Sequence, residues 1–255
     1  LEDALRETER LREEGYLEIV VTGIEISSYG RDLEGVTLLD AIPAICKAAR
    51  PARVRLGSLE PGTITPELVE MARRQENLCP HFHLSLQSGC DETLRRMGRR
   101  YDTARVAEAI DRLREAFPDC GITADLIVGF PGETEEEFAA TLEFIRKCRF
   151  TGMHIFPYSP RPGTRAAAMP GQLDKETKRR RAHIAGKAAR EMKARFLRSL
   201  VGTEQEVLFE TEEDGVCSGH AGNYAEVRVF ARGLARSLHR VRIIEAKEDL
   251  VLGEL

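Results

Sequence analysis

Short apolar stretches alternate with longer amphipathic ones over the first 160 residues. The short stretches have the length and apolar content of strands, and they fall at 17–23, 53–59, 81–86, 121–128 and 152–158. The longer stretches place apolar residues at helical spacing, at 1–14, 38–49, 66–75, 103–117 and 135–147. This regular alternation of strand and helix predicts a parallel sheet with covering helices.

Several expected helices begin with residues that satisfy the free N–H groups of a first turn. Thr134 with Glu137, and Thr37 with Asp40, have the spacing of a capping box. Thr65 stands directly before a proline, which is the arrangement of an N-cap followed by proline at the first helical position. These signals support the helix boundaries drawn from periodicity.

The pattern changes after residue 171. Residues 174–199 form one long helical pattern that lies between Gly171 and Gly202. Beyond it, residues 204–210, 224–230 and 240–245 alternate like half-buried strands separated by glycine-containing turns. The sequence therefore predicts three parts: an α/β part over 1–171, a connecting helix over 172–200, and a small antiparallel β domain over 201–255.

Charge is distributed unevenly among these parts. The net charge of −4 argues against a general nucleic-acid binder, but residues 172–200 hold ten basic and three acidic groups. The basic residues of this helix are Lys175, Lys178, Arg179, Arg180, Arg181, Lys187, Arg190, Lys193, Arg195 and Arg198. Such a helix could follow RNA phosphates, and the alternative is an ordinary solvated helix face.

The remaining composition fits a globular protein of a reducing compartment. No apolar run approaches the length of a membrane span, and residues 1–14 are too charged for a secretory signal. The six cysteines are scattered, as expected for buried thiols in the cytoplasm. His81 and His83 lie two apart on one expected strand face, where packing is a more natural role than metal binding because no third ligand is evident.

Small and polar residues follow each expected strand. In a parallel α/β barrel, ligands bind at these carboxyl ends of the strands. Glycine there permits close approach of the backbone to a ligand, and polar side chains can hydrogen-bond it. The five segments are 22–30, 57–62, 85–89, 125–133 and 156–164. Each could be a simple tight turn, but five in succession predict one shared binding rim.

Three long motifs resemble those of the radical S-adenosylmethionine (SAM) methylthiotransferases. They are HFHLSLQSGCDETLRRMGRRYD, ADLIVGFPGETEEEF and FPYSPRPGT, in that order along the chain. The resemblance implies a partial radical SAM (β/α)6 barrel followed by a TRAM-like β-barrel that binds RNA. It also implies that the N-terminal domain and the cluster-binding loop of the family are missing from this chain.

The strings VTGIEISSYGRD, RLGSLEP and CPHFHLSLQSG resemble the branch that acts on N6-threonylcarbamoyladenosine at tRNA position 37. The late string GHAGNY also resembles that branch. The alternatives are the branches that act on isopentenyladenosine or on a ribosomal protein, a tRNA-binding fragment without catalysis, and an unrelated α/β barrel enzyme.

The resemblance implies roles for residues in the first three loops. Gly23 and Glu25 match the motif after the second family strand, whose backbone receives the SAM amino group. This chain has Thr22 where a first glycine of that motif is common. Ser58 and Gln87 are expected to face the SAM carboxylate and ribose.

The last two loops have implied roles as well. Ile127 and Gly129 fall in the motif that packs on adenine, and Phe156 is expected to offer a backbone contact to the adenine edge. Arg161 is expected to contact either the SAM carboxylate or tRNA phosphate, because a guanidinium suits both.

The family's chemistry requires SAM and two [4Fe–4S] clusters, whose thiolate ligands this chain is not expected to supply. The implied reaction cleaves SAM reductively, removes hydrogen from adenine C2 and inserts a methylthio group. No three cysteines here have the CxxxCxxC spacing. The chain alone is therefore expected to be inactive, and no catalytic or metal-ligating residue is assigned.

The RNA contacts are assigned to the helix and the last domain. The expected residues are Lys178, Arg179, Arg180, Arg181, Lys187, Arg190, Arg228 and Arg240. The last domain holds six basic and eleven acidic groups, so either its contacts come from a local patch such as Arg228, Arg232, Arg236 and Arg240, or the helix carries most of the attraction. The expected partner is a tRNA, the expected state is a monomer in the cytoplasm without membrane association, and the sequence does not identify the sulfur or electron donor.

Overall fold

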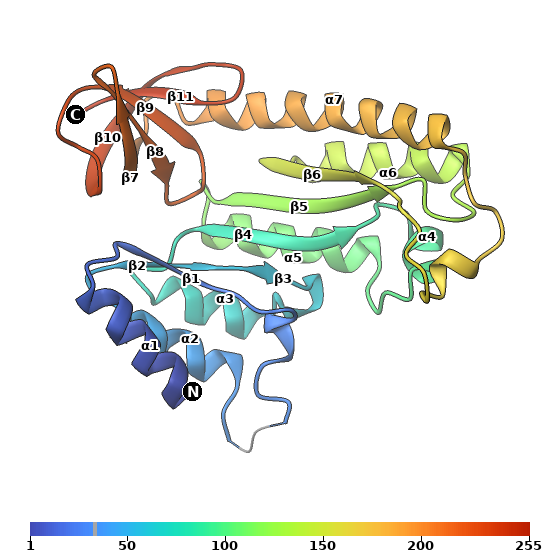
Figure 1. The fold of residues 1–255 in the computed structure, drawn as a ribbon, viewed down its shortest axis with the longest axis horizontal. Coiled ribbons are helices and arrows are strands. Elements are labelled where there is room, and N and C mark those ends of the chain that lie inside the picture. The colour runs from blue at the N-terminus through green and yellow to red at the C-terminus, as the bar shows by residue number, and fades with distance from the viewer. Residues whose placement is uncertain (33–34) are drawn as a thin grey trace.

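The structure, a computed structural model, describes residues 1–32 and 35–255 (Figure 1). An arc of parallel strands with helices on its outer side forms the first part, and a closed β-barrel forms the last part. The long helix α7 (Lys175–Ser199) runs beside the last parallel strand and leads into the barrel. This arrangement confirms the predicted fold class.

The parallel strands follow each other in chain order. They are β1 (Glu18–Val21), β2 (Arg53–Leu56), β3 (Ser58–Leu59), β4 (His81–Gln87), β5 (Gly121–Val128) and β6 (Gly152–Pro157). β1 pairs with β2, and β3 to β6 pair in sequence, all of them in parallel. The strand predicted at 53–59 is thus divided into two short strands, and the arc is open rather than a closed barrel.

The helices cover the outer face of this arc. They are α1 (Glu2–Glu13), α2 (Leu38–Ala49), α3 (Pro66–Arg73), α4 (Asp91–Arg96), α5 (Thr103–Ala116) and α6 (Glu135–Cys148). Except for the short α4, which contacts the start of α6 through Thr93 and Arg96, these helices form one core with alternate residues of the strands, such as Phe82 and Leu126. The two predicted capping boxes and the Thr65 cap are all present.

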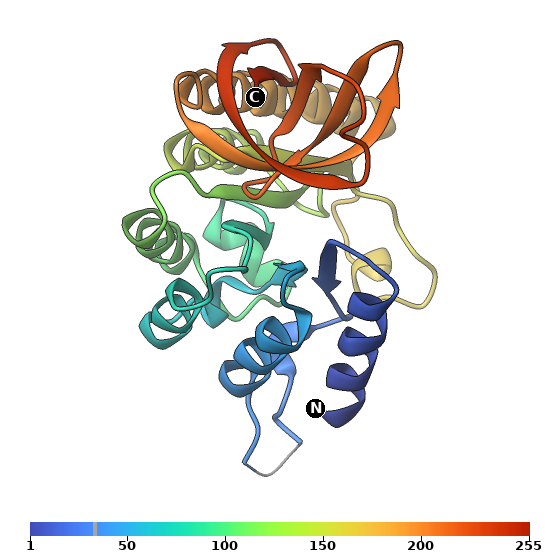
Figure 2. The same ribbon diagram turned by 90° about the vertical axis from the view of Figure 1, so that its left-hand side faces the viewer.

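The closed barrel has the strand order β10-β11-β9-β8-β7, and its neighbouring strands pair antiparallel as predicted except β11 and β9, which pair in parallel. Its strands are β7 (Glu204–Glu213), β8 (Val216–Ala221), β9 (Glu226–Phe230), β10 (Ser237–Ala246) and β11 (Val251–Glu254). Figure 2 looks at the molecule from the barrel side and shows the barrel in front of α7. The end of α7 joins the two parts, because Leu197 and Leu200 belong to the barrel core while Ala188 and Met192 belong to the first core.

Buried charge also fixes the barrel against the amino ends of the parallel strands. Glu18 accepts hydrogen bonds from Arg53 and Arg55, and both arginines are buried. Arg53 also donates to the carbonyl of His220 at 2.9 Å, and Arg55 donates to the carbonyl of Gly222 at 2.9 Å. The carboxylate thus neutralises two guanidinium groups that satisfy carbonyls of the barrel.

The two parts approach each other very closely at Gly121. A Cβ atom on this residue would lie 2.0 Å from the carbonyl oxygen of Asn223, so only glycine fits. Tyr224, the next residue of the barrel, stacks on His81 at the amino end of β4, with 4.7 Å between ring centroids. The barrel therefore closes the end of the arc that is opposite the five predicted loops.

Candidate functional site

The inner face of the arc consists of the strand residues that point away from the helices. Buried residues alternate with half-buried ones along β4 and β5, as expected for strands packed on one side only. On β5 the half-buried residues are Thr123, Asp125 and Ile127. Because the alternate residues of these strands pack on the helices, this second set faces the concave side.

Four of the predicted cofactor residues lie on this face, three of them near the carboxyl ends of their strands. They are Ser58 on β3, Gln87 on β4, Ile127 on β5 and Phe156 on β6. Ile127 and Phe156 are register partners, and the Phe156 ring is half exposed. Since the strands are parallel, their carboxyl ends lie at one edge, and the structure brings Gln87, Ile127 and Phe156 to a common rim. Ser58 lies further back along the sheet, because its register partner is His83, four residues before Gln87.

The other four predicted cofactor residues lie in the loops of the same rim. Gly23 and Glu25 follow β1, and Arg161 is exposed in the loop after β6. The first two loops are joined because the backbone N–H of Glu60 donates to Ser27 Oγ at 3.0 Å. Gly129 has a positive φ of 72°, and a Cβ there would lie 2.5 Å from Lys178 Cγ, so this glycine is also required by packing against α7.

The chemical types of these residues suit a nucleoside ligand such as SAM. The face offers polar groups on β3 and β4 beside the apolar Ile127 and the half-exposed ring of Phe156, a combination typical of small-molecule sites. Gln87 adopts a positive φ of 63° at an irregularity of the β4–β5 ladder. Its backbone is therefore turned out of the regular strand at the rim itself.

The cysteines do not fit an iron–sulfur cluster. All six are buried and free, and within the described residues they form no group of three neighbouring ligands. Burial raises the pKa of the Cys46 thiol to about 11, and those of Cys79, Cys120 and Cys148 to about 12. Because cluster ligands are thiolates, these protonated core thiols are unsuited to that role.

The basic helix presents some of its charges to solvent. Arg179, Lys187 and Arg190 are exposed on α7. Arg180 is exposed but pairs with Glu135 at 2.7 Å, and the Lys178 ammonium lies 5.2 Å from the centroid of the Tyr158 ring. The first half of α7 and residues 157–160 line a cleft of about 1150 Å³.

The expectation that Arg181 contacts RNA is wrong. Its side chain is 3% exposed, and it donates to the fully buried carboxylate of Glu133 at 2.6 Å and to Glu135 at 2.7 Å. The sequence could not show this, because the partners lie nearly fifty residues earlier. Arg181 therefore holds α7 against the loop that follows β5.

Arg228 and Arg240 do not form a basic patch on the barrel. Arg228 pairs with Glu226 at 2.8 Å and lines a surface hollow together with Glu210, Glu213 and Asp214. Arg240 lies on β10, which is separated from β9 by β11, and its nearest carboxylate is that of Glu204 at 4.0 Å. The exposed positive charge near the cleft is thus concentrated on α7.

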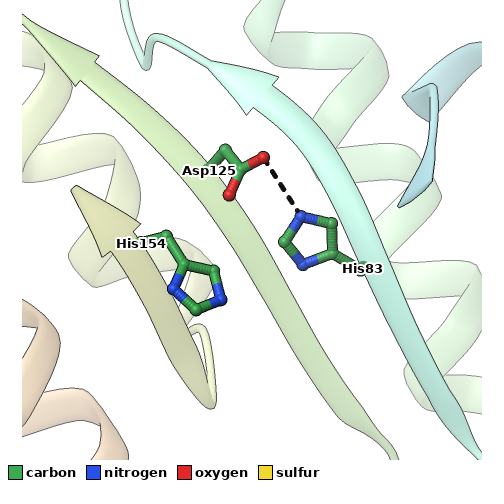
Figure 3. A group of neighbouring side chains, drawn as sticks. All are labelled: His83, Asp125 and His154. Atoms are coloured by element: carbon green, nitrogen blue, oxygen red, sulfur yellow. Dashed lines mark ion pairs between the residues drawn. The ribbon is translucent and has the colours of Figure 1, made fainter. Parts of the chain in front are cut away.

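A polar group that the sequence analysis missed lies on the inner face. His81 and His83 do share one strand face, as predicted, and both hydrogen-bond to Thr123 Oγ1. Two further residues with atoms that could ligate a metal ion, Asp125 and His154 from the next two strands, lie beside His83 (Figure 3). Only the pairing of β4, β5 and β6 brings these residues together.

Comparison with known proteins identifies the family. Residues 1–145 match the model of the radical SAM superfamily, and the chain belongs to that superfamily. It is 38% identical over 240 residues to a Thermotoga maritima protein named threonylcarbamoyladenosine tRNA methylthiotransferase MtaB, an alignment that covers 94% of this chain and 55% of the relative. A Bacillus subtilis protein of the same name is 34% identical over 253 residues, with 96% and 56% covered.

Other relatives have a different substrate in their name. A Frankia alni protein named tRNA-2-methylthio-N(6)-dimethylallyladenosine synthase is 45% identical over 176 residues, covering 69% of this chain and 35% of the relative. The chain spans about half the length of the first two relatives. The resemblance to radical SAM methylthiotransferases is confirmed.

Solved structures agree on the fold. Coproporphyrinogen III oxidase from Escherichia coli, a radical SAM enzyme, superposes with a TM-score of 0.57 at 15% identity, over 88% of this chain and 58% of that one. At such low identity the match shows the fold alone. No helix among the described residues is long and apolar enough to span a membrane.

Proposed function

We propose that this chain is the SAM-binding and tRNA-contacting part of an enzyme that methylthiolates C2 of N6-threonylcarbamoyladenosine at position 37 of tRNA. The observation that supports this most directly is the shared rim of Gln87, Ile127 and Phe156 in a chain that aligns over 94% of its length with a protein of that name. The rest of the proposal follows from what these residues can do.

The chain's own residues would bind and orient the cofactor. Gln87 and Ser58 would hydrogen-bond its polar groups, while Ile127 and the Phe156 backbone would contact the adenine. In this superfamily SAM, once it receives an electron from an iron–sulfur cluster, would supply the group that removes hydrogen from a C–H bond. The cysteines of this chain do not fit cluster ligation, so we propose that the chain alone performs no turnover.

The exposed face of α7 would carry the attraction for tRNA. Arg179, Lys187 and Arg190 have no carboxylate partner among the described residues, so their charge is available to phosphate. Such contacts release counterions and make the affinity dependent on salt. The remaining parts of the enzyme, the sulfur donor and the electron donor would act on the nucleoside held at the rim.

A second candidate is methylthiolation of an isopentenyl-type adenosine. The 45% identity to the Frankia alni relative over 176 residues favours it, although that alignment covers less of the chain. Mass spectrometry of tRNA nucleosides from a strain that lacks the gene separates the two. We expect loss of the methylthio-threonylcarbamoyl nucleoside, and its unchanged level would refute the proposal.

SAM binding by the chain itself tests the rim. Gln87→Ala is expected to weaken binding of S-adenosylhomocysteine in calorimetry by about fivefold, since one hydrogen bond contributes roughly 1 kcal/mol. Glu108→Gln, on the outer helix α5, is the matched control and should leave the affinity unchanged. Equal affinities for both variants would remove Gln87 from the site.

A further inference from the structure

Three titratable side chains on neighbouring strands lie next to the candidate cofactor residues. They are His83 on β4, Asp125 on β5 and His154 on β6, and their ligand atoms all lie within 4.8 Å of one another. Figure 3 shows the three side chains on the same side of the strands. His83 and Asp125 are half-buried, and His154 is exposed.

A chain of hydrogen bonds holds His83 in place. His81 Nε2 lies 3.0 Å from Thr123 Oγ1, which lies 2.9 Å from His83 Nδ1, and His83 Nε2 lies 3.3 Å from an oxygen of Asp125. The Thr123 hydroxyl can accept from one imidazole and donate to the other, so His83 can donate to Asp125 from Nε2. Both nitrogens of His83 are therefore occupied.

His154 and the other oxygen of Asp125 are open to a ligand. His154 makes no side-chain hydrogen bond within the part of the chain that the structure describes, and its ring is exposed. The hydrogen bond from His83 lowers the pKa of Asp125, so the carboxyl is ionised at neutral pH. The pair thus offers one imidazole and one carboxylate on an open concave face.

The position of this pair relates it to the substrate. Asp125 and His154 are register partners, and so are Ile127 and Phe156 two residues further along the same strands. The two pairs are therefore separated by about 7 Å along the sheet. In adenine, C2 and C6 are both bonded to N1, so a substituent on N6 lies close to the carbon that would react. A nucleoside placed with C2 against SAM would direct its N6 substituent into this neighbouring space.

We propose that His154 and Asp125, with His83 as the positioning residue, recognise the N6 substituent of the target adenosine and select a polar substituent over an apolar one. This inference rests on the proposed function. A threonylcarbamoyl group carries urea N–H groups, a hydroxyl and a carboxylate. The N–H groups or the hydroxyl can donate to Asp125, and His154 can donate to the carboxylate.

An isopentenyl group would fit this space poorly. It would cover the Asp125 carboxylate without giving it a hydrogen bond, and a carboxylate removed from water without a partner is destabilised. Sites built from hydrogen-bonding groups reject analogues that lack the matching group more strongly than apolar pockets reject analogues by size. The pair therefore acts as a specificity determinant rather than as part of the C–H activation.

The test uses this 255-residue chain and synthetic anticodon stem-loops that differ only at position 37. Fluorescence anisotropy compares threonylcarbamoyladenosine, isopentenyladenosine and unmodified adenosine. We expect the first to bind about tenfold more tightly than the second, the size of one hydrogen bond to a charged group. His154→Phe should reduce this preference to less than about twofold, and His154→Gln should retain part of it.

Controls separate recognition from folding. Asp125→Asn keeps the size of the side chain and should also lower the preference, so a misfolded His154 variant does not decide the outcome. His239→Phe, a histidine change in the small barrel, should leave the preference intact. Melting temperatures of all variants are measured in parallel.

The outcomes distinguish this inference from the proposed function. Equal binding of all three stem-loops, or a preference that survives both His154→Phe and Asp125→Asn, would overturn the inference and leave tRNA binding standing. Loss of the preference after dialysis against EDTA would also overturn it, because a metal ion would then make the contact. Failure to bind any stem-loop would refute the proposed role in tRNA binding, and the inference with it.

Discussion

Replacing Arg181 by methionine separates a structural role from an RNA-binding role within one helix. Arg181 is 3% exposed and donates to Glu133, which is 0% exposed, and Glu133 also accepts the backbone N–H of Gly129 at 2.7 Å. The ion pair therefore connects α7 to the turn after β5. Methionine fills a similar volume but leaves the Glu133 carboxylate buried without its cation.

The expected cost is large for a single substitution. Removing one partner of a buried ion pair destabilises proteins by about 3–5 kcal/mol. Burial already raises the pKa of Glu133, so the carboxyl can take up a proton once Arg181 is gone, which limits the loss to about 3 kcal/mol. In a chain of this size such a loss lowers the melting temperature by about 6–12 °C.

Differential scanning fluorimetry and tRNA binding provide the two readouts. Arg180→Met is the matched control, because Arg180 is half exposed and its pair with Glu135 is worth less than about 1 kcal/mol. The double variant Arg181→Met, Glu133→Gln should recover part of the stability, since the glutamine oxygen can still accept from Gly129. At a temperature where all variants are folded, Arg181→Met should bind tRNA as the parent chain does. A melting temperature equal to that of the control, or a selective loss of tRNA affinity, would refute the reasoning.

Three further predictions concern acid stability, salt and iron. Burial lowers the pKa of His81 from 6.5 to about 3, so the stability that comes from its neutral form is present above about pH 6.5 and is lost as the pH falls towards 3. Urea unfolding at several pH values should show that the free energy of unfolding falls less steeply with pH for His81→Phe than for the parent chain. An identical pH profile for the two chains would contradict this. Changing Arg179, Lys187 and Arg190 together to glutamine should weaken tRNA binding and make the slope of log affinity against log salt concentration shallower by about two to three. An unchanged slope would exclude α7 from the interface. Anaerobic iron–sulfur reconstitution of this chain should give no cluster absorbance, and stoichiometric iron bound through its cysteines would contradict the assignment of those thiols to the core.

Periodicity and end signals were sufficient for most of the fold. The helix at Leu38–Ala49 and the strand at Gly121–Val128 have the predicted bounds, because each has a clear apolar pattern and sharp flanking signals. The strands at Val216–Ala221 and Val251–Glu254 were missed. The first contains small and polar residues, and the second is only four residues long, so both depend on the barrel around them.

The candidate site was predictable only in part. The rim follows from a general property of parallel strands, so its loops are predictable from the sequence. The roles of Arg181 and His154 depend on partners that are far away in the sequence, Glu133 for the first and Asp125 for the second. No local pattern distinguishes a basic residue that faces solvent from one that meets a buried carboxylate.

Mapping the SAM contact by ultraviolet cross-linking tests the central claim most directly. The chain is irradiated with radiolabelled SAM, with and without excess S-adenosylhomocysteine, and the labelled peptides are identified by mass spectrometry. We expect label in peptides that contain Gln87, Ile127 or Phe156, and we expect excess S-adenosylhomocysteine to prevent it. If the label that S-adenosylhomocysteine prevents were confined to the outer helices or to the small barrel, the SAM site would not lie at the rim.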